Sequence, residues 1–198
     1  HLPLDNIGPG ATRGAYTSAS NIGVYLWAVV SARDLHLVSQ RQAEKLVTAT
    51  LTSVRTLSSS HGFLYQWYDT STGHAIRNPG DIDCITETTR VQDNCSFLSA
   101  VDNGWYASGL MVTRQALPEL APLVNSLLSQ MDFSIFYDNR AQTDCNTNPA
   151  VAGNQPTGQM FGGYYVDQGP AGYHNGALYS DPRIAMYLGM GLHQMPGD

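Results

Sequence analysis

The chain has 198 residues, a formal net charge of −6 at neutral pH and 13% charged residues, about half the usual share. This length can bury one core, so we expect a single domain over residues 1–198. The negative charge and the lack of a basic cluster exclude a nucleic-acid-binding protein, which would need Lys and Arg to neutralise phosphates. No apolar run approaches the roughly 20 residues of a membrane-spanning helix, and no membrane span is expected.

The N-terminal part of the chain predicts a pair of helices. Residues 1–17 are punctuated by Gly and Pro and predict an irregular lead-in. Apolar residues at helical spacing then predict a helix over 18–37. Ser39 and Gln42 form a capping-box pair at the start of a second helix, which the segment 58–62 ends. Two antiparallel helices with so short a link form a helical hairpin.

A segment of mixed character follows this hairpin. Residues 61–70 alternate in polarity and end in a turn, which predicts either a short strand or an extended aromatic loop. Residues 74–95 are polar and irregular.

The second half of the chain repeats the helical pattern. One helix is expected over 97–117 and another over 118–131, with Pro118 suited to a first turn. Residues 139–172 are irregular, and a last helix is expected over 181–192. Repeated hairpins with long, aromatic-rich connections predict an all-α fold, part of an α/α toroid whose loops line a cleft.

The three cysteines bear on redox state and location. Cys84 and Cys95 bracket a polar loop and are expected to form a disulfide, while the partner of Cys145 cannot be identified from the sequence. The alternative is three free thiols in a cytosolic protein. Because the polar surface is mostly uncharged and Lys45 is the only lysine, we expect a secreted or extracytoplasmic protein.

Aromatic and polar side chains in the connections suggest carbohydrate binding. Sugar rings pack their C–H faces on aromatic planes, and their hydroxyls need polar partners, although large aromatics are also common in cores. The candidate substrate-binding residues are Asp69, Trp67, Tyr68, Trp105, Tyr173, His174 and Arg183.

Three carboxylates lie beside these aromatics. Glycoside hydrolysis needs one carboxylic acid to protonate the leaving oxygen and one carboxylate to activate water or attack. We expect Asp181 and Asp102 to be catalytic and Asp69 to bind substrate. Each has a structural alternative, because Asp69 precedes a turn, Asp102 suits a helix dipole and Asp181 suits an N-cap before Pro182.

The sequence predicts no metal site and no cofactor. Asp81, Asp83 and Glu87 lack the glycine and terminal Glu of an EF-hand loop, so a solvated acidic loop is expected there. The histidines lack zinc-ligand spacing, and both the nucleophile elbow and the phosphate-binding glycine loops are absent.

Four segments resemble one known family. Residues 17–23 (Thr-Ser-Ala-Ser-Asn-Ile-Gly), 62–69 (Gly-Phe-Leu-Tyr-Gln-Trp-Tyr-Asp), 99–104 (Ser-Ala-Val-Asp-Asn-Gly) and 179–189 resemble the glycoamylase-like domain family, in family order. That family includes endo-β-1,2-glucanases and the glucan-processing domain of cyclic β-1,2-glucan synthases. The resemblance implies an (α/α)6 toroid of antiparallel helical hairpins that acts on glycosidic bonds by acid/base chemistry.

Two departures from the family pattern have consequences. Family domains are about twice as long, so this chain is expected to be the N-terminal half, completed by a second chain or a missing C-terminal half. The family also has Glu where Asp181 stands.

These observations predict a secreted glycoside hydrolase acting on a β-glucan-type polysaccharide, with an oligo- or polysaccharide as its partner. One alternative is a polysaccharide lyase, for which Tyr173, His174 and Asn175 would supply the acid/base groups. The other is a non-catalytic glycan-binding or assembly subunit.

Overall fold

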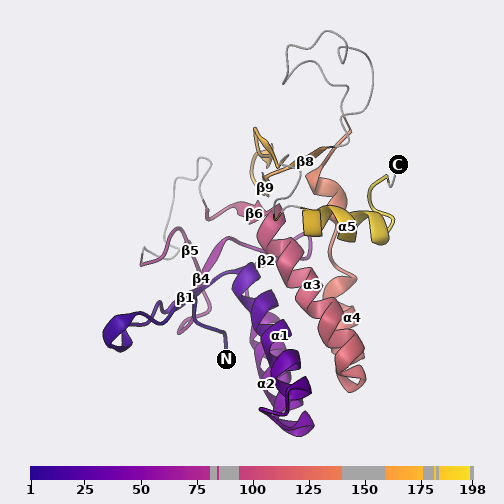
Figure 1. Cartoon of the computed structure of the whole chain (residues 1–198). Helices are drawn as coiled ribbons and strands as arrows, with labels where there is room; N and C mark the ends of the chain where they lie inside the picture. The colour runs from indigo at the N-terminus through magenta and orange to yellow at the C-terminus, as the bar shows by residue number, and fades with distance from the viewer. Residues whose placement is uncertain (81–83, 85–93, 140–158, 176–180, 182, 197–198) are drawn as a thin grey trace.

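Helices make up the largest part of the fold (Figure 1). The computed structural model describes residues 1–80, 84, 94–139, 159–175, 181 and 183–196. The α-helices of these residues are α1 (Ala19–Asp34), α2 (Gln40–Val54), α3 (Ala100–Ala116), α4 (Ala121–Leu128) and α5 (Arg183–Gly191). Short 3₁₀ helices are η1 (Pro9–Ala11), η3 (Pro118–Leu120) and η4 (Phe133–Phe136).

The predicted helical hairpin is present as α1 and α2, and its caps explain where each helix begins. The Ser18 side chain accepts a hydrogen bond from the Asn21 backbone N–H at the start of α1. At the start of α2, Ser39 and Gln42 form the predicted capping box. Each cap satisfies backbone donors that the first turn leaves unpaired.

Helices α1 and α3 pack against each other unusually closely, and they run in the same direction (Figure 1). Gly23 on α1 allows this approach, because a Cβ there would lie 2.2 Å from the Trp105 carbonyl oxygen. Gly109 is the reciprocal contact on α3, where a Cβ would lie 2.4 Å from the Gly23 oxygen. Backbone therefore meets backbone at this crossing.

The expectation of an all-α fold, and with it the all-helical toroid, is wrong. The described residues are 47% helical and 18% strand, and their strands form four small sheets, which makes the fold mixed α/β. Three of these sheets have three strands, in the orders β1-β4-β5, β10-β9-β6 and β11-β8-β7, and the fourth is the pair β2-β3. The strands are β1 (Tyr16–Thr17), β2 (Ser59–Ser60), β3 (Phe63–Leu64), β4 (Trp67–Asp69), β5 (Ala75–Ile76), β6 (Phe97–Ser99), β7 (Tyr137–Asp138), β8 (Gln159–Phe161), β9 (Gly163–Tyr165), β10 (Gly169–Pro170) and β11 (His174–Asn175).

Most of these strands could not be predicted from the sequence, for a physical reason. Each has two or three residues, which is too short for alternation to emerge. Several of the pairings also join distant segments, such as β1 with β4 and β6 with β9. Of the two predictions for residues 61–70, the short strand is confirmed, as β3 and β4.

Aromatic side chains fill the core between the helices and the sheets. Phe63 contacts both Phe133 and Phe136, with ring centroids 5.0 and 4.9 Å apart. Tyr68 and Tyr106 are also fully buried, and burial raises the pKa of each phenol above its ordinary value. This core holds the segment 63–69 against the first turns of α3.

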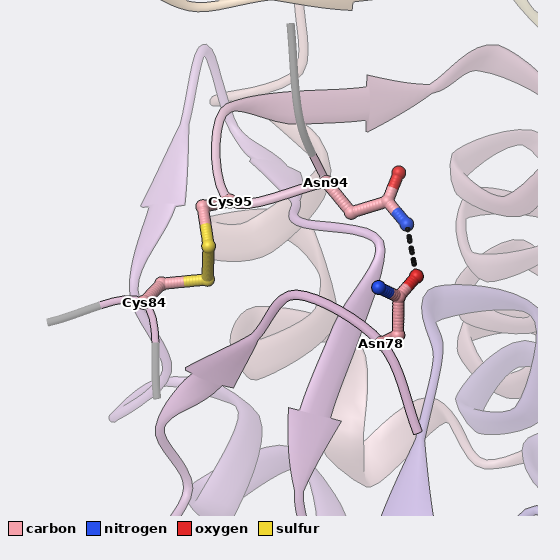
Figure 2. The surroundings of a disulfide bond; sticks show 4 residues. All are labelled: Asn78, Cys84, Asn94 and Cys95. Atoms are coloured by element: carbon pink, nitrogen blue, oxygen red, sulfur yellow. Dashed lines mark hydrogen bonds between the residues drawn. A yellow bond between two sulfur atoms is a disulfide. The ribbon is translucent and has the colours of Figure 1, made fainter. Parts of the chain in front are cut away.

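The predicted disulfide between Cys84 and Cys95 is confirmed (Figure 2), and both residues are buried. Beside it, the Asn94 side-chain amide donates to the Asn78 side-chain oxygen at 3.1 Å. The bond therefore closes a loop beside the sheet β1-β4-β5. Cys145 lies outside the described residues, as do Asp81, Asp83 and Glu87 of the predicted acidic loop.

Removing this crosslink is expected to destabilise the domain. The cysteines are 11 positions apart, and the chain-entropy relation for such a loop gives about 3 kcal/mol. We expect the Cys84→Ala/Cys95→Ala variant to lose about this much unfolding free energy in a denaturant titration. Equal stability of the wild type with and without reductant, together with alkylation of all thiols in the untreated protein, would contradict this prediction.

No helix in the described part of the chain is both long enough and apolar enough to cross a membrane.

Candidate functional site

The first turns of α1 and α3 lie at the same end of the molecule, next to the small sheets (Figure 1). Each helix is preceded directly by a strand, β1 before α1 and β6 before α3. Helix N-termini present unpaired N–H groups and favour negative charge. We refer to the first turn of α3 and the residues packed around it as the α3 end.

Asp102 lies in the first turn of α3 and is half-buried. Its backbone N–H donates to the N-cap side chain of Ser99 at 3.2 Å, and its Oδ2 accepts from Gln66 Nε2, also at 3.2 Å. Gln66 Oε1 is buried and has no hydrogen-bond partner. A buried acceptor without a partner costs free energy, which makes it a natural contact for a ligand hydroxyl.

Asn103 fixes the segment that carries Gln66. Its side-chain oxygen accepts from the Leu64 backbone N–H at 2.9 Å, and its amide donates to the Leu64 carbonyl at 3.0 Å. The amide also donates to the Ser99 carbonyl at 2.9 Å, and Asn103 is fully buried. These hydrogen bonds join β3 to the first turn of α3. They therefore fix the position of Gln66 relative to Asp102.

The start of α5 packs directly on the α3 end. A Cβ on Gly104 would lie 2.8 Å from Ile184 Cγ2 and 2.9 Å from Ala185 Cβ. Asp181 is close to this contact along the chain, because its carbonyl accepts from the Ile184 N–H at 3.4 Å. The first turn of α3, which carries Asp102, therefore lies close to the start of α5. That helix begins at Arg183, two residues after Asp181 and two residues later than predicted.

The surroundings of Asp181 differ from those expected for a catalytic acid. The residue is exposed, whereas catalytic acids are usually held in apolar pockets. Arg183 donates from Nη1 to the Tyr187 hydroxyl at 3.1 Å.

Two backbone hydrogen bonds connect the segment of Tyr173 and His174 to the α3 end. The Ala100 N–H donates to the Gly162 carbonyl at 3.2 Å, and the Gly162 N–H donates to the Tyr173 carbonyl at 2.9 Å. Tyr173 is 52% exposed. Its pKa is raised, mainly by desolvation and to a smaller extent by the charge of the neighbouring Tyr165. His174 Nε2 lies 2.7 Å from Asp138 Oδ2. These two candidates therefore lie beside the helix that carries Asp102.

Three other candidates have structural contacts. Tyr68 has no exposed surface, and its hydroxyl donates to the Ser58 carbonyl at 2.5 Å, so a sugar cannot contact it. Trp105 lies edge-on to Trp27, with ring centroids 6.0 Å apart at the crossing of α1 and α3. Trp67 is half-buried and lies edge-on to Tyr16, 5.6 Å away.

Asp69 is engaged in a turn. Its Oδ1 accepts from the backbone N–H groups of Ser71 and Thr72 at 2.8 and 2.9 Å. The Ser71 hydroxyl is the largest cause of a lowered pKa at this carboxyl. Together with the other hydrogen bonds from Ser71 and Thr72, it holds the pKa below the ordinary value of 3.8. Its contacts favour the turn, which was its structural alternative, over substrate binding.

This lowered pKa predicts a pH-dependent contribution to stability. A carboxyl with a lower pKa in the folded state stabilises the fold above its unfolded pKa, and the contribution is lost as the pH falls through the folded pKa. We expect Asp69→Asn to be less stable than wild type at about pH 7 and nearly equal to it at about pH 2. Urea titrations of both proteins at the two pH values test this, and a constant difference between them would contradict it.

Sequence reasoning missed two residues of this region, Gln66 and Asp138. Gln66 is a polar residue between aromatics, and only the long-range pairing with Asp102 reveals it. Asp138 is 3% exposed and meets His174 from 36 positions away. No local spacing pattern signals such a pair.

Other features of the described surface lie apart from the α3 end. Among the described residues, no group of three or more His, Cys, Asp or Glu side chains is arranged to hold a metal. One pocket of about 400 Å³ lies beside the disulfide and is lined by residues that include Tyr65 and His74. Another, of about 490 Å³, is lined by the N-terminus and α2. Neither of these two pockets is lined by Asp102 or Asp181.

The fold is similar to three solved structures. A glucoamylase-like protein from Bacteroides fragilis superposes with a TM-score of 0.56 at 14% identity, over 84% of this chain and 34% of that one. An endo-β-1,2-glucanase from Chitinophaga pinensis, in complex with sophorotriose and glucose, gives 0.61 at 12% identity, over 93% and 38%. A glucoamylase-like protein from Bacteroides caccae gives 0.53 at 12%, over 83% and 34%.

These similarities confirm the expected resemblance at the level of fold. The chain spans little more than a third of the length of each of these three solved structures. A search of curated proteins found no match. Residues 10–165, most of the chain, match the family described as "Protein of unknown function (DUF3131)", and the chain therefore belongs to that family.

Proposed function

We propose that the chain is part of a glycoside hydrolase domain that cleaves a β-linked glucan at the α3 end. The observation that carries this proposal is the packing of the first turns of α3 and α5 on each other, marked by Gly104 and Ile184. Carboxylates from two helix starts, Asp102 and Asp181, thereby lie at one end of the molecule. The fold is shared with an endo-β-1,2-glucanase, which supports a glucan as the substrate class.

The chemistry requires a proton donor and a second carboxylate. Asp102 is half-buried against Gln66, whereas Asp181 is exposed. Because a catalytic acid is usually enclosed, Asp102 suits the acid role and Asp181 suits the carboxylate that activates water or attacks. This assignment reverses the sequence-based expectation that Asp181 is the acid.

A neutral glucan fits this site better than a uronate polymer. A lyase must neutralise the uronate carboxylate, and the chain carries a net charge of −6, with two carboxylates at the α3 end. The disulfide supports action outside the cytosol, because structural disulfides persist in oxidising compartments.

Product analysis tests the proposal. The protein is incubated with β-1,2-glucan, with sophorotriose and, in parallel, with polygalacturonate, and both reducing ends and the absorbance of unsaturated uronides are measured. We expect new reducing ends from the neutral glucan and a large loss of this activity in Asp181→Asn, which removes the carboxylate and keeps the approximate shape of the side chain. Unsaturated products would indicate a lyase, and glucan binding without cleavage would indicate a binding subunit; either result would contradict the proposal.

We further propose that additional polypeptide covers one face of α1. Val24 and Trp27 are 50% and 39% exposed on this helix, and the matched structures are nearly three times as long as the aligned part. Large exposed apolar patches usually mark contact surfaces.

The exposed face of α1 predicts dye binding. The 198-residue chain is expected to bind an apolar dye such as anilinonaphthalene sulfonate, and Val24→Ser/Trp27→Ser is expected to reduce the fluorescence severalfold. Leu35→Ser, at an exposed position beyond the end of α1, is the control. Equal fluorescence of the double variant and the wild type would contradict the proposal.

A further inference from the structure

One face of the sheet β11-β8-β7 combines a buried carboxylate with an imidazole. In the register, Asp138 is opposite Gln159, and His174 is opposite Phe161. Side chains alternate between the faces of a strand, so all four of these residues share one face. The His174 ring stacks on Phe161, with centroids 5.0 Å apart and planes 20° apart.

The two polar residues of this face are held in a defined geometry. Asp138 is 3% exposed, and its Oδ2 lies 2.7 Å from His174 Nε2. A buried carboxylate needs hydrogen-bond donors to offset its lost hydration. The carboxylate therefore favours the neutral tautomer whose proton is on Nε2, which leaves the Nδ1 lone pair free to accept.

The rest of the imidazole is available to a ligand. The His174 side chain is 18% exposed, and Nε2 to Asp138 is its one hydrogen bond within the part of the chain that the structure describes. The stacking on Phe161 and the contact with Asp138 favour this orientation of the ring. Its Nδ1 is thus a fixed acceptor that makes no hydrogen bond within the described structure.

His174 directly follows Tyr173 in the chain, and the backbone connects this segment to the α3 end. The ring of Tyr173 lies over Gly162, where an added Cβ would be 1.8 Å from Tyr173 Cε2. Gly162 is in turn bonded to Ala100, the first residue of α3. A polar acceptor near the proposed catalytic carboxylates matches the hydroxyls of a neutral sugar.

We propose that His174, positioned by Asp138, is a recognition residue for a glucan hydroxyl. Its Nδ1 accepts the hydrogen bond that the sugar hydroxyl donates. Asp138 is a positioning residue that acts through His174. This inference rests on the proposed glucan substrate. It adds to the proposed site the pair His174 and Asp138, which recognises one sugar hydroxyl.

The tautomer of His174 is tested without any ligand. Imidazole ¹⁵N shifts of the wild type at about pH 8 are expected to show the proton on Nε2. Asp138→Ala is expected to lose this preference, and Asp138→Leu, which keeps the approximate volume and has no acceptor, serves if the Ala variant does not fold. A wild-type proton on Nδ1 would overturn the proposal.

Sophorotriose binding, measured by calorimetry, tests recognition. His174→Gln is expected to raise the Kd about tenfold, the value of one good hydrogen bond. Asp138→Ala is expected to raise it by a similar factor, and the double variant no further, because residues that act through one another are not additive. The control is His36→Gln, a change at an exposed histidine after α1, at the opposite end of that helix from the site.

The outcomes separate this inference from the proposed function. If the wild type cleaves the glucan and Asp102→Asn does not, while His174→Gln binds normally, the recognition role alone is overturned. Additive losses in the double variant would overturn the positioning role of Asp138. If the wild type neither binds nor cleaves the glucan, both proposals fail.

Discussion

Replacing Asp102 with Asn is expected to lower glucan hydrolysis by a factor on the order of 10² or more, the usual cost of losing an acid/base group. Asn has nearly the same shape, and its oxygen can still accept the hydrogen bond that Gln66 donates at 3.2 Å. The first turn of α3 also keeps its Ser99 cap. The substitution therefore removes the titrating group and leaves its setting intact.

The matched control for this variant is Asp34→Asn. Asp34 is the last residue of α1 and pairs with Arg33 at 2.6 Å, at the end of the helix remote from the site. The Asp34→Asn substitution removes the same charge as Asp102→Asn, so it controls for the change in net charge. Initial rates of reducing-end release compare the three proteins, and equal rates for Asp102→Asn and wild type would remove Asp102 from the catalytic residues.

Replacing Gly23 with Ala is expected to cost more than about 3 kcal/mol of unfolding free energy, above the usual range for overpacking. The new Cβ would lie 2.2 Å from the Trp105 carbonyl oxygen and 2.8 Å from Tyr106 Cα. These are backbone atoms of α3, which cannot turn aside as a side chain can. The helices must separate, and the contacts along their shared face are lost.

Denaturant titration measures this loss, and a second glycine provides the control. Gly172 has nothing within 4 Å of an added Cβ, so Gly172→Ala is expected to change stability by less than about 1 kcal/mol. If Gly23→Ala were as stable as Gly172→Ala, the close approach of α1 and α3 would be wrong.

The helices could be predicted from the sequence because their signals are local. The helix expected over 18–37 corresponds to Ala19–Asp34, and the capping box of Ser39 starts α2 as expected. The helix expected over 118–131 is present as η3 followed by α4. Spacing of apolar residues and N-cap chemistry involve neighbours within one turn, which a single sequence displays.

The sheets could not be predicted because their pairing is remote. β6 pairs with β9, so Phe97 lies opposite Tyr165, and neither segment is long enough to show alternation. The same limit applies to the candidate site. Asp102 could be identified from its own segment, whereas the links of Gln66 to Asp102 and of Asp138 to His174 exist only after folding.

The site claim is tested most directly by mapping where a glucan binds. Backbone amide shifts of the ¹⁵N-labelled protein are recorded during titration with sophorotriose. The account predicts that the largest changes fall on Gln66, Asp102, Tyr173 and His174, and that the far end of α1, around His36, stays unchanged. Changes concentrated at His36, or none at saturating sophorotriose, would contradict the assignment of the α3 end as a glucan site.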